Sequence, residues 1–245
     1  MAFAELSSIK VAEVIVISDG RMRNSVNLQS ACCDPQTMES NKAVYFVTKR
    51  CLDIVFGILG CNILLPIAIL VKIAYLLTGD TAPIIYSHKR IARYGKAFRM
   101  YKFRSMIPDA DEMLLELLKD EANRHQWDEN QKLDKDPRIT TIGEFLRKSS
   151  LDEFPQFINV VKGDMSLVGP RPLAEGELEE HDGITIYNAV KPGITGWWAC
   201  NGRSNVGYKE RLDLEYYYVK NCSLRLDGLI ICKTIMSVLS GDGAY

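Results

Sequence analysis

The chain has 245 residues, enough to bury one substantial core. Its 30 lysines and arginines balance 31 aspartates and glutamates, so the net charge of -1 gives no overall attraction to nucleic acid. Seven cysteines, an odd number without a CxxC pair, argue against a disulfide framework and a structural zinc site and favour a reducing compartment. The three histidines, His88, His125 and His181, are too scattered to indicate a histidine-rich metal site or a histidine-based triad.

The first 43 residues are treated as an N-terminal extension of unknown role. They hold one short β-like run at residues 11–17, followed by a polar stretch through Ser40. This is too little for a domain of its own, and we assign the extension no chemistry.

Residues 52–77 form an apolar segment long enough to reach across a bilayer, interrupted only by Asp53, Asn62 and Lys72. The segment begins about fifty residues into the chain and lacks a small-residue cleavage site, so it is not a signal peptide. This segment could form a straight transmembrane helix or a buried core helix of a soluble protein, and both alternatives stay open.

Basic residues flank this apolar segment on both sides. Lys49 and Arg50 precede it, and a run of lysines and arginines without acidic residues follows between positions 81 and 108. Because positive residues favour the cytoplasm, both ends are expected on one face, and Pro66 near the middle provides a kink. The sequence therefore predicts a re-entrant helix over residues 44–80, which enters one leaflet, kinks at residues 62–66 and returns.

Residues 109–124 have the pattern of an amphipathic helix that begins at Asp109, with Met113, Leu114, Leu117 and Leu118 on one side. A polar connection is expected over residues 125–137. The run Tyr216, Tyr217 and Tyr218 is interpreted as core or interfacial aromatics, because no basic stripe accompanies it as a nucleic-acid site would need.

Two adjacent carboxylates, Asp152 and Glu153, stand close in sequence to Arg171, which lies between Pro170 and Pro172. The prolines fix their own φ and favour extended backbone at their neighbours, so the guanidinium has a stiff support suited to bidentate phosphate contact. The combination indicates a phosphate-handling site. The plainer alternative is a helix-capping aspartate followed by a first-turn glutamate.

Ser150 and Glu153 have capping-box spacing, but that register would put Pro155 at the fifth helical position, where it disfavours a helix. We therefore expect Asp152 at or beside the N-cap, Pro155 in the first turn and a helix end at Gly163. Both carboxylates would then lie at a helix N-terminus, where free N–H groups favour anions.

From residue 49 to residue 245 the chain resembles the bacterial sugar transferases, the monotopic phosphoglycosyl transferases. The resemblance rests on Lys49 and Arg50 and on six separate motifs in order: YKFRSM at 101–106, DPR at 136–138, LDEFPQ at 151–156, KGDMSLVGPRP at 162–172, KPGITG at 191–196 and NGR at 201–203. The closing residues 242–245 and the context of Arg203 are most similar to the undecaprenyl-phosphate galactose or glucose phosphotransferase branch.

The resemblance implies transfer of a sugar 1-phosphate from a UDP-sugar to polyprenyl (undecaprenyl) phosphate with release of UMP, the first membrane step of polysaccharide or glycoconjugate assembly. It implies that Asp152 is the nucleophile, forming a covalent aspartyl-phosphosugar, and that Glu153 holds Mg²⁺. The other implied contacts are to phosphate, from Lys102, Arg104, Arg147 and Arg171, and to the nucleotide, from Arg203.

The resemblance also implies a mainly α fold with minor β structure: a re-entrant membrane helix and, over residues 81–245, a membrane-associated catalytic domain with interfacial amphipathic helices. The expected place is the cytoplasmic face of a bacterial inner membrane. Expected partners are a UDP-sugar, polyprenyl phosphate and membrane lipids but no nucleic acid; association between copies of the chain is left open. The alternative from another class is a non-catalytic scaffold or regulator of polysaccharide assembly, against which Asp152, Glu153 and Arg171 argue.

The chain departs from the family pattern at three places. Leu65 stands where a serine usually precedes the kink proline, and Ala199 stands within a Trp-Gln-Val motif that here reads Trp-Ala-Cys. Cys222 and Arg225 replace frequent tryptophans, so an aromatic interface anchor is expected to be weaker.

Overall fold

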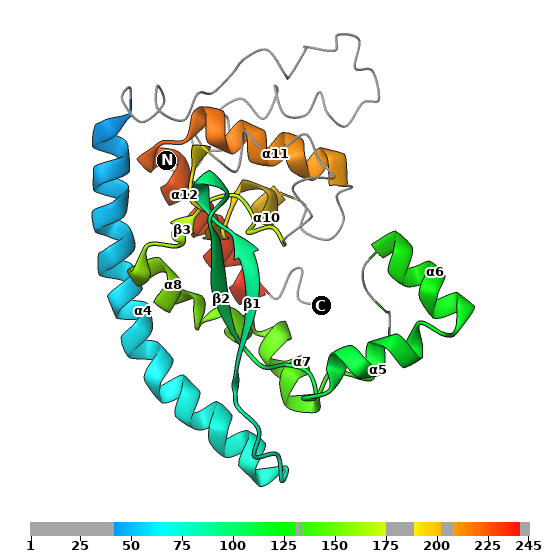
Figure 1. The fold of residues 1–245 in the computed structure, drawn as a ribbon. Helices are drawn as coiled ribbons and strands as arrows, with labels where there is room; N and C mark the ends of the chain where they lie inside the picture. Colours follow the sequence, from blue (N-terminus) through cyan, green and yellow to red (C-terminus); the bar gives the residue numbers. More distant parts are fainter. Residues whose placement is uncertain (1–41, 131–132, 134, 175–188, 202–207, 241–245) are drawn as a thin grey trace. The chain divides into compact units, whose positions relative to one another are not determined.

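The computed structural model describes residues 42–130, 133, 135–174, 189–201 and 208–240, all of which belong to one compact unit, Cys33–Tyr245. The β-like run expected at residues 11–17 lies outside the described residues. Within them the fold is mainly helical with two small sheets, which confirms the expected class (Figure 1).

The elements follow in chain order. They are α4 (Ala43–Leu77), β1 (Ile85–Ile91), β2 (Ala97–Phe103), α5 (Ala110–Leu117), α6 (Glu121–Asn130), α7 (Thr141–Lys148), the 3₁₀ turn η3 (Leu151–Glu153), α8 (Gln156–Lys162), β3 (Ser166–Val168), β4 (Gly193–Thr195), α10 (Trp197–Asn201), α11 (Tyr208–Asn221) and α12 (Leu224–Ser240).

Helix α4 contains the apolar segment and has two unlike faces. Its 35 residues give it a length of about 50 Å, and by length and composition it could cross a membrane. One face packs on the rest of the fold, with Gly60 against the ring of Phe157 in α8. The other face stays exposed although it is apolar, since Leu65 is 66% and Leu70 67% exposed. This exposure contradicts the alternative of a buried core helix.

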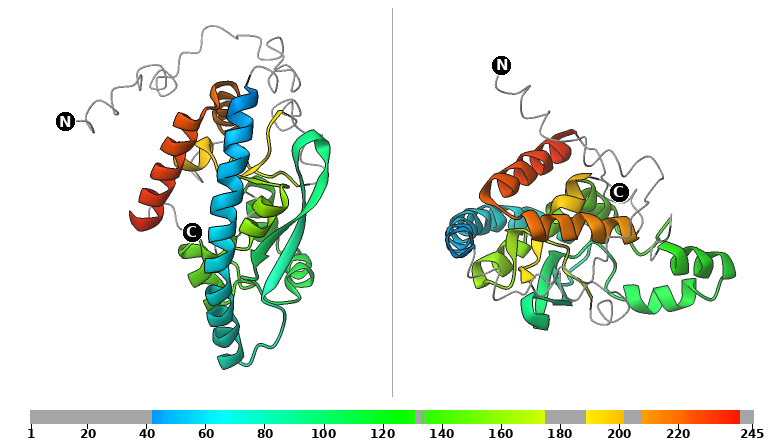
Figure 2. Two further views of the ribbon diagram at one scale, coloured as in Figure 1. Left: turned by 90° about the vertical axis from the view of Figure 1, so that its left-hand side faces the viewer. Right: turned by 90° about the horizontal axis from the view of Figure 1, so that it is seen from above.

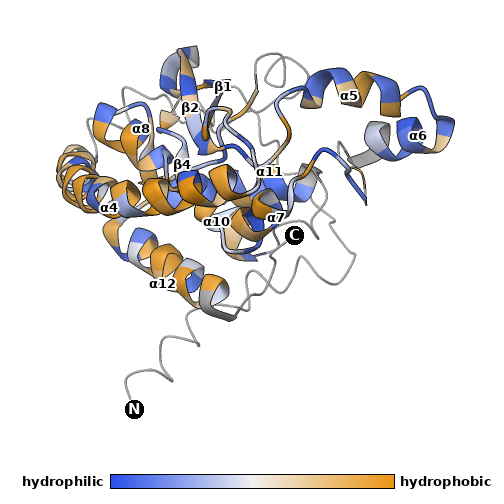
Figure 3. Ribbon diagram, turned by 90° about the horizontal axis from the view of Figure 1, so that it is seen from below, coloured by the Kyte–Doolittle hydropathy of each residue, from blue (hydrophilic) through white to orange (hydrophobic). Residues whose placement is uncertain are grey.

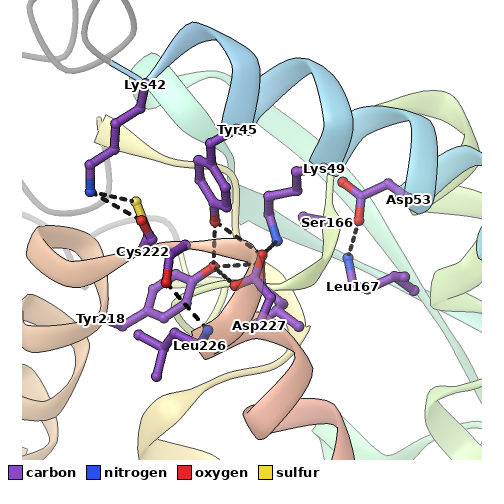
Figure 4. A network of polar contacts seen from close by, with 12 residues as sticks. Lys42, Tyr45, Lys49, Asp53, Ser166, Leu167, Tyr218, Cys222, Leu226 and Asp227 are labelled. Atoms are coloured by element: carbon purple, nitrogen blue, oxygen red, sulfur yellow. Dashed lines mark hydrogen bonds and ion pairs between the residues drawn. The ribbon is translucent and has the colours of Figure 1, made fainter.

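Two of the three polar residues in the apolar segment are bound by the fold itself. Asp53 is buried, and its Oδ1 accepts hydrogen bonds from Ser166 Oγ at 3.0 Å and from the Leu167 N–H at 2.9 Å (Figure 4). Lys72 Nζ donates to the carbonyl of Thr81 at 3.0 Å. The third, Asn62, is exposed. The two charged residues of the segment are thus bound by other parts of the protein, and the exposed face of α4 is apolar apart from Asn62.

Pro66 lies inside α4, which stays helical to Leu77, while the ribbon of the helix changes direction part-way along (Figure 1). A proline removes the hydrogen bond to the carbonyl four residues earlier, here that of Asn62, and this is a common cause of bending. The chain does not return within α4, so the re-entrant path stays a prediction.

Helix α8 lies between α4 and the hairpin of β1 and β2 (Figure 2). The hairpin pairs Ile85 with Phe103 at one end and Ile91 with Ala97 at the other. Strands β3 and β4 are parallel and join two of the motifs, residues 162–172 and 191–196. A β-carbon on Gly169 would collide with the backbone of Lys191 to Gly193, so this close approach requires glycine.

The prediction of a single amphipathic helix at residues 109–124 is wrong in one respect, because two helices, α5 and α6, occupy this stretch. Helix α5 ends at Leu117, and Asp120 starts α6 by accepting a hydrogen bond from the Asn123 N–H at 3.0 Å. Helix α6 then continues to Asn130, through half of the expected polar connection. Met113, Leu114 and Leu117 are half-buried on α5, as the pattern predicts.

A buried polar network ties α4 to α11 and α12. Asp227 accepts hydrogen bonds from Tyr45 at 3.0 Å and Tyr218 at 2.8 Å and pairs with Lys49 Nζ at 2.8 Å (Figure 4). Tyr218 is a core residue, as expected for the tyrosine run. Cys222 is also buried and its carbonyl accepts from Lys42, so position 222 is no interface anchor in this chain.

Candidate active site

The two carboxylates lie on a connection between α7 and α8. Thr140 caps α7 by accepting a hydrogen bond from the Gly143 N–H at 2.9 Å, and the helix ends at Lys148. Ser150 then reverses the chain in a left-handed conformation with φ of 55°. The 3₁₀ turn η3, which contains Asp152 and Glu153, follows directly.

The predicted position of Asp152 at or beside the N-cap of α8 is wrong. Asp152 lies inside η3, and the residue that precedes α8 is Pro155. Because Pro155 has no N–H, it interrupts the hydrogen bonds of the turn, and the α-helix begins only after it. The predicted end at Gly163 is confirmed, since that glycine has φ of 91° and its N–H bonds to Asn159.

Lys102 on β2 brings a cation to both carboxylates. Its Nζ lies 2.8 Å from Glu153 Oε1 and 3.6 Å from Asp152 Oδ2. Asp152 is buried, whereas the Glu153 side chain is 37% exposed. A residue fifty positions away in sequence thus forms one site with the carboxylate pair.

Burial raises the pKa of Asp152 above its ordinary value. Lys102 opposes the rise, Glu153 adds to it, and Arg147 opposes it. Burial alone would lower the pKa of Lys102, but the attraction of Glu153 and Asp152 outweighs burial and the pKa of Lys102 is raised. Asp152 is therefore a poorly hydrated carboxylate whose ionisation depends on two neighbouring cations.

Arg147, in the last turn of α7, is the second cation whose charge acts on Asp152. Its Nε donates to Ser105 Oγ at 2.9 Å, which fixes the guanidinium beside the motif at 101–106. Burial lowers the pKa of Arg147, while the charges of Asp152 and Asp136 oppose the fall. Asp136 is in turn held by Arg138 through bonds of 2.8 and 2.6 Å. The DPR motif is thus an internal ion pair close to Arg147.

Arg104 is engaged elsewhere. It is buried, and its guanidinium binds Asp80 Oδ2 at 2.9 Å and the carbonyl of Pro83 at 2.9 Å. It also lies over the ring of Tyr75 at 4.5 Å. These contacts lock the loop after α4 to β2 and favour a structural role, so we leave Arg104 out of the proposed phosphate contacts.

The loop of Arg171 is held by a buried carboxylate. The Arg171 N–H donates to Glu215 Oε1 at 3.1 Å, and Glu215 on α11 is 1% exposed. The Arg171 side chain is half-buried, and its contact with phosphate stays a prediction. Sequence reasoning missed Glu215, although it falls on the buried stripe of α11 with Leu214, Tyr218 and Val219. Arg203 lies outside the described residues.

Residues 44–241 match the model of the family described as bacterial sugar transferase. The chain belongs to this family. It is 48% identical to the undecaprenyl-phosphate galactose phosphotransferase of Salmonella typhimurium over 80% of the chain and 41% of that protein. It is 39% identical to the exopolysaccharide production protein ExoY of Sinorhizobium fredii, over 86% of the chain and 94% of ExoY.

A third relative is the UDP-N-acetylgalactosamine-undecaprenyl-phosphate N-acetylgalactosaminephosphotransferase of Aeromonas hydrophila, 34% identical over 82% of the chain and 46% of that protein. The chain spans about two fifths of the length of the Salmonella protein and of the UDP-galactose-lipid carrier transferase of Erwinia amylovora.

The donor chemistry of the carboxylate pair would suit Mg²⁺ if substrate phosphates supplied further oxygen ligands. Lys102 takes one hydrogen-bonding position on Glu153, and a carboxylate has several. In the part of the chain that the structure describes, no group of three His, Cys, Asp or Glu side chains gathers here. Mg²⁺ is commonly held by one or two carboxylates together with substrate phosphates, which is the donor set that this site and a diphosphate would offer.

Proposed function

We propose that the protein transfers a sugar 1-phosphate from a UDP-sugar to polyprenyl phosphate and releases UMP. The observation that carries the proposal is the buried carboxylate of Asp152, which lies 3.6 Å from Lys102 Nζ and whose pKa is also lowered by the charge of Arg147. The names of the Salmonella and Aeromonas relatives, which specify undecaprenyl phosphate as acceptor, support the same reaction for this chain. Because this reaction attaches the first sugar to the lipid carrier, it begins the assembly of a polysaccharide or glycoconjugate.

The reaction proceeds in two displacements at phosphorus. An Asp152 oxygen attacks the sugar-bearing phosphate; a carboxylate–phosphorus bond forms, and the bond to the bridging oxygen breaks, so UMP leaves with the electron pair. A phosphate oxygen of the lipid acceptor then attacks the same phosphorus. The sugar becomes linked to the lipid through a diphosphate, and the Asp152 carboxylate is free again.

The cations reduce the repulsion between an anionic nucleophile and an anionic substrate. Lys102 lies beside the nucleophile, Arg147 adds the effect of its positive charge on Asp152, and Arg171 on its proline-supported loop is assigned to a substrate phosphate. Glu153, with Asp152 beside it, would hold Mg²⁺, which when bound supplies further charge neutralisation on the diphosphate.

We assign the protein to the cytoplasmic face of the bacterial inner membrane. Apolar residues line the outer face of α4 and continue on α12, where Ile235 and Met236 are more than half exposed (Figure 3). Both ends of α4 bind the same domain, through Tyr45 to Asp227 and through Tyr75 to the Arg104 carbonyl. This arrangement favours residues 44–80 entering one leaflet and returning, with residues 81–245 forming the catalytic domain at the surface.

A UMP-release assay tests the reaction. Purified protein with Mg²⁺, polyprenyl phosphate and each of a panel of UDP-sugars should release UMP with at least one donor, in step with formation of a lipid-linked sugar. Asp152→Asn should release none. A scaffold that keeps the fold without catalysis would release no UMP with any donor while still binding membranes.

A further inference from the structure

A fully buried asparagine, Asn159, joins α8 to strand β2. Its Oδ1 accepts a hydrogen bond from the Tyr101 N–H at 3.0 Å, and its Nδ2 donates one to the Arg99 carbonyl at 2.7 Å. Backbone groups two residues apart in a strand point to the same side, so both bonds lie on the same edge of β2. The side-chain amide thus takes the place that a peptide group of a neighbouring strand would occupy.

The asparagine has a fixed support at the end of α8. Its carbonyl accepts hydrogen bonds from the N–H groups of Gly163 and Asp164, both at 3.0 Å, and from that of Met165 at 3.3 Å. Its Nδ2 also lies 3.5 Å from Asp164 Oδ2. Because the carbonyl and both polar atoms of the amide are engaged, a different rotamer would take these partners away from the backbone of β2. The side chain is therefore a rigid link between the helix and the strand.

The strand position that Asn159 holds is next to Lys102. Tyr101 directly precedes Lys102, whose Nζ lies 2.8 Å from Glu153 Oε1 and 3.6 Å from Asp152 Oδ2. The two carboxylates lie in η3, which comes before α8. Asn159 therefore connects the strand that carries the cation with the helix that follows the carboxylates (Figure 2). Since the stem of a lysine is flexible, the place of its amine depends on where the strand holds its backbone.

We propose that Asn159 is a positioning residue of the carboxylate site, which holds β2 on α8 and thereby keeps Lys102 beside the two carboxylates. Its side-chain bonds go to β2 and to the turn after α8, not to the reacting groups, so its effect passes through Lys102. Asn159 lies between the motifs at 151–156 and 162–172, and neither motif nominates it. The kinetic effect rests on the proposed function, whereas the link between β2 and α8 does not.

A double-mutant cycle separates positioning from general stabilisation of the fold. Asn159→Ala should lower kcat/KM for UMP release roughly tenfold or more, because the strand no longer holds Lys102 beside the attacking carboxylate. In Lys102→Gln, where the amine is already absent, the same change should lower kcat/KM by less than about twofold. The control is Tyr218→Phe, which removes the bonds of a buried hydroxyl to Asp227 and to the Val168 carbonyl. Its effect should be the same with and without Lys102. Equal effects of Asn159→Ala in both backgrounds would overturn the proposal.

Hydrogen exchange tests the link without relying on activity. The Tyr101 amide should exchange slowly in the unchanged protein, and in Asn159→Ala its exchange should rise roughly tenfold or more while that of α12 rises much less. Protein in detergent is followed by mass spectrometry with single-residue fragmentation, and unfolding midpoints of all variants are measured alongside. An equal rise in α12, or exchange of Tyr101 at the rate of an unfolded peptide in the unchanged protein, would overturn the proposal.

Asn159→Asp takes the place of the alanine variant in the cycle if that variant does not fold. It keeps the size of the side chain and the acceptor for Tyr101 but loses the donor to Arg99, so its effect should also vanish in Lys102→Gln. If the unchanged protein released no UMP with any donor, the proposed reaction would fail. The exchange of Tyr101 would then decide alone whether Asn159 holds β2.

Discussion

Lys102 controls the charge state of the proposed nucleophile. Asp152 must be ionised to attack, so activity falls as the pH drops through its pKa, which burial raises. The positive charge of Lys102 lowers that pKa, and its removal should raise the pKa further. Lys102→Gln should therefore move the acid limb of the kcat/KM profile to higher pH and lower the plateau by roughly 100-fold.

The measurement is UMP release at saturating Mg²⁺ between acid and neutral pH. Lys148→Gln is the matched control, since Lys148 is exposed and pairs with Glu144 on the same helix turn. An acid limb that stays in place in Lys102→Gln would show that Lys102 does not act on the ionising group.

Arg171 is proposed to use its planar guanidinium, not only its charge. Arg171→Lys keeps the charge but loses the two-pronged contact with phosphate, so turnover should fall by roughly 100-fold with the fold preserved. The backbone bond to Glu215 is unaffected by this change, which makes misfolding a poor explanation for a loss. Arg99→Lys, at an exposed arginine on β2, serves as control. Wild-type turnover in Arg171→Lys would assign Arg171 a structural role.

At the scale of elements, local patterns were predicted well and contacts between distant segments were not. The apolar segment and the end of α8 at Gly163 follow from hydropathy and from glycine in the left-handed conformation. The η3 turn was missed because a 3₁₀ turn and an N-cap have similar sequence signals before a proline. The partnership of Lys102 with Glu153 depends on β2 lying beside η3, which no local pattern contains.

Helix α4 packs on α8, and the η3 turn that carries Asp152 comes directly before α8. The packing of the two helices therefore supports the position of Asp152. A side chain on Gly60 would overlap the ring of Phe157 and push the two helices apart. Gly60→Val should destabilise the protein by about 1–3 kcal/mol, measured by denaturant unfolding in detergent, and should reduce UMP release. Leu65→Ala, on the exposed face of the same helix, should change the unfolding free energy little. Equal effects of the two changes would contradict the assignment of the faces.

At the scale of the molecule, both ends of α4 are bound to one domain, and this decides the expected topology. Single cysteines at Val44 and Lys96, both exposed, should be inaccessible to an impermeant thiol reagent in intact cells and labelled after permeabilisation. The background is a chain without its native cysteines.

Pro66→Leu, which restores a helical hydrogen bond, should move some molecules to a spanning topology. Labelling of either site from outside in the otherwise unchanged chain would establish a spanning helix instead.

The sequence resemblance and the structure support the proposed chemistry in different ways. Motif order identifies the family and nominates Asp152 and Glu153 together with four basic residues, Lys102, Arg104, Arg147 and Arg171. The fold adds that Lys102 pairs with Asp152, that the charge of Arg147 acts on Asp152, and that Arg104 is held by Asp80. Arg104 and Lys102 lie two residues apart in one motif, so sequence alone could not separate their roles.

The most direct test of the central claim is capture of the phosphosugar on Asp152. Enzyme given a UDP-sugar and Mg²⁺ without a lipid acceptor should release UMP in an amount comparable to the enzyme and then stop, because the acyl phosphate waits for its second substrate. Intact-protein mass spectrometry should show one added sugar phosphate, located at residue 152. Asp152→Asn should give neither the burst nor the added mass, and Glu153→Gln should need more Mg²⁺ for whatever activity remains. A stoichiometric burst from Asp152→Asn, or turnover without any added mass on the wild-type protein, would contradict the covalent mechanism and favour direct transfer between the two substrates.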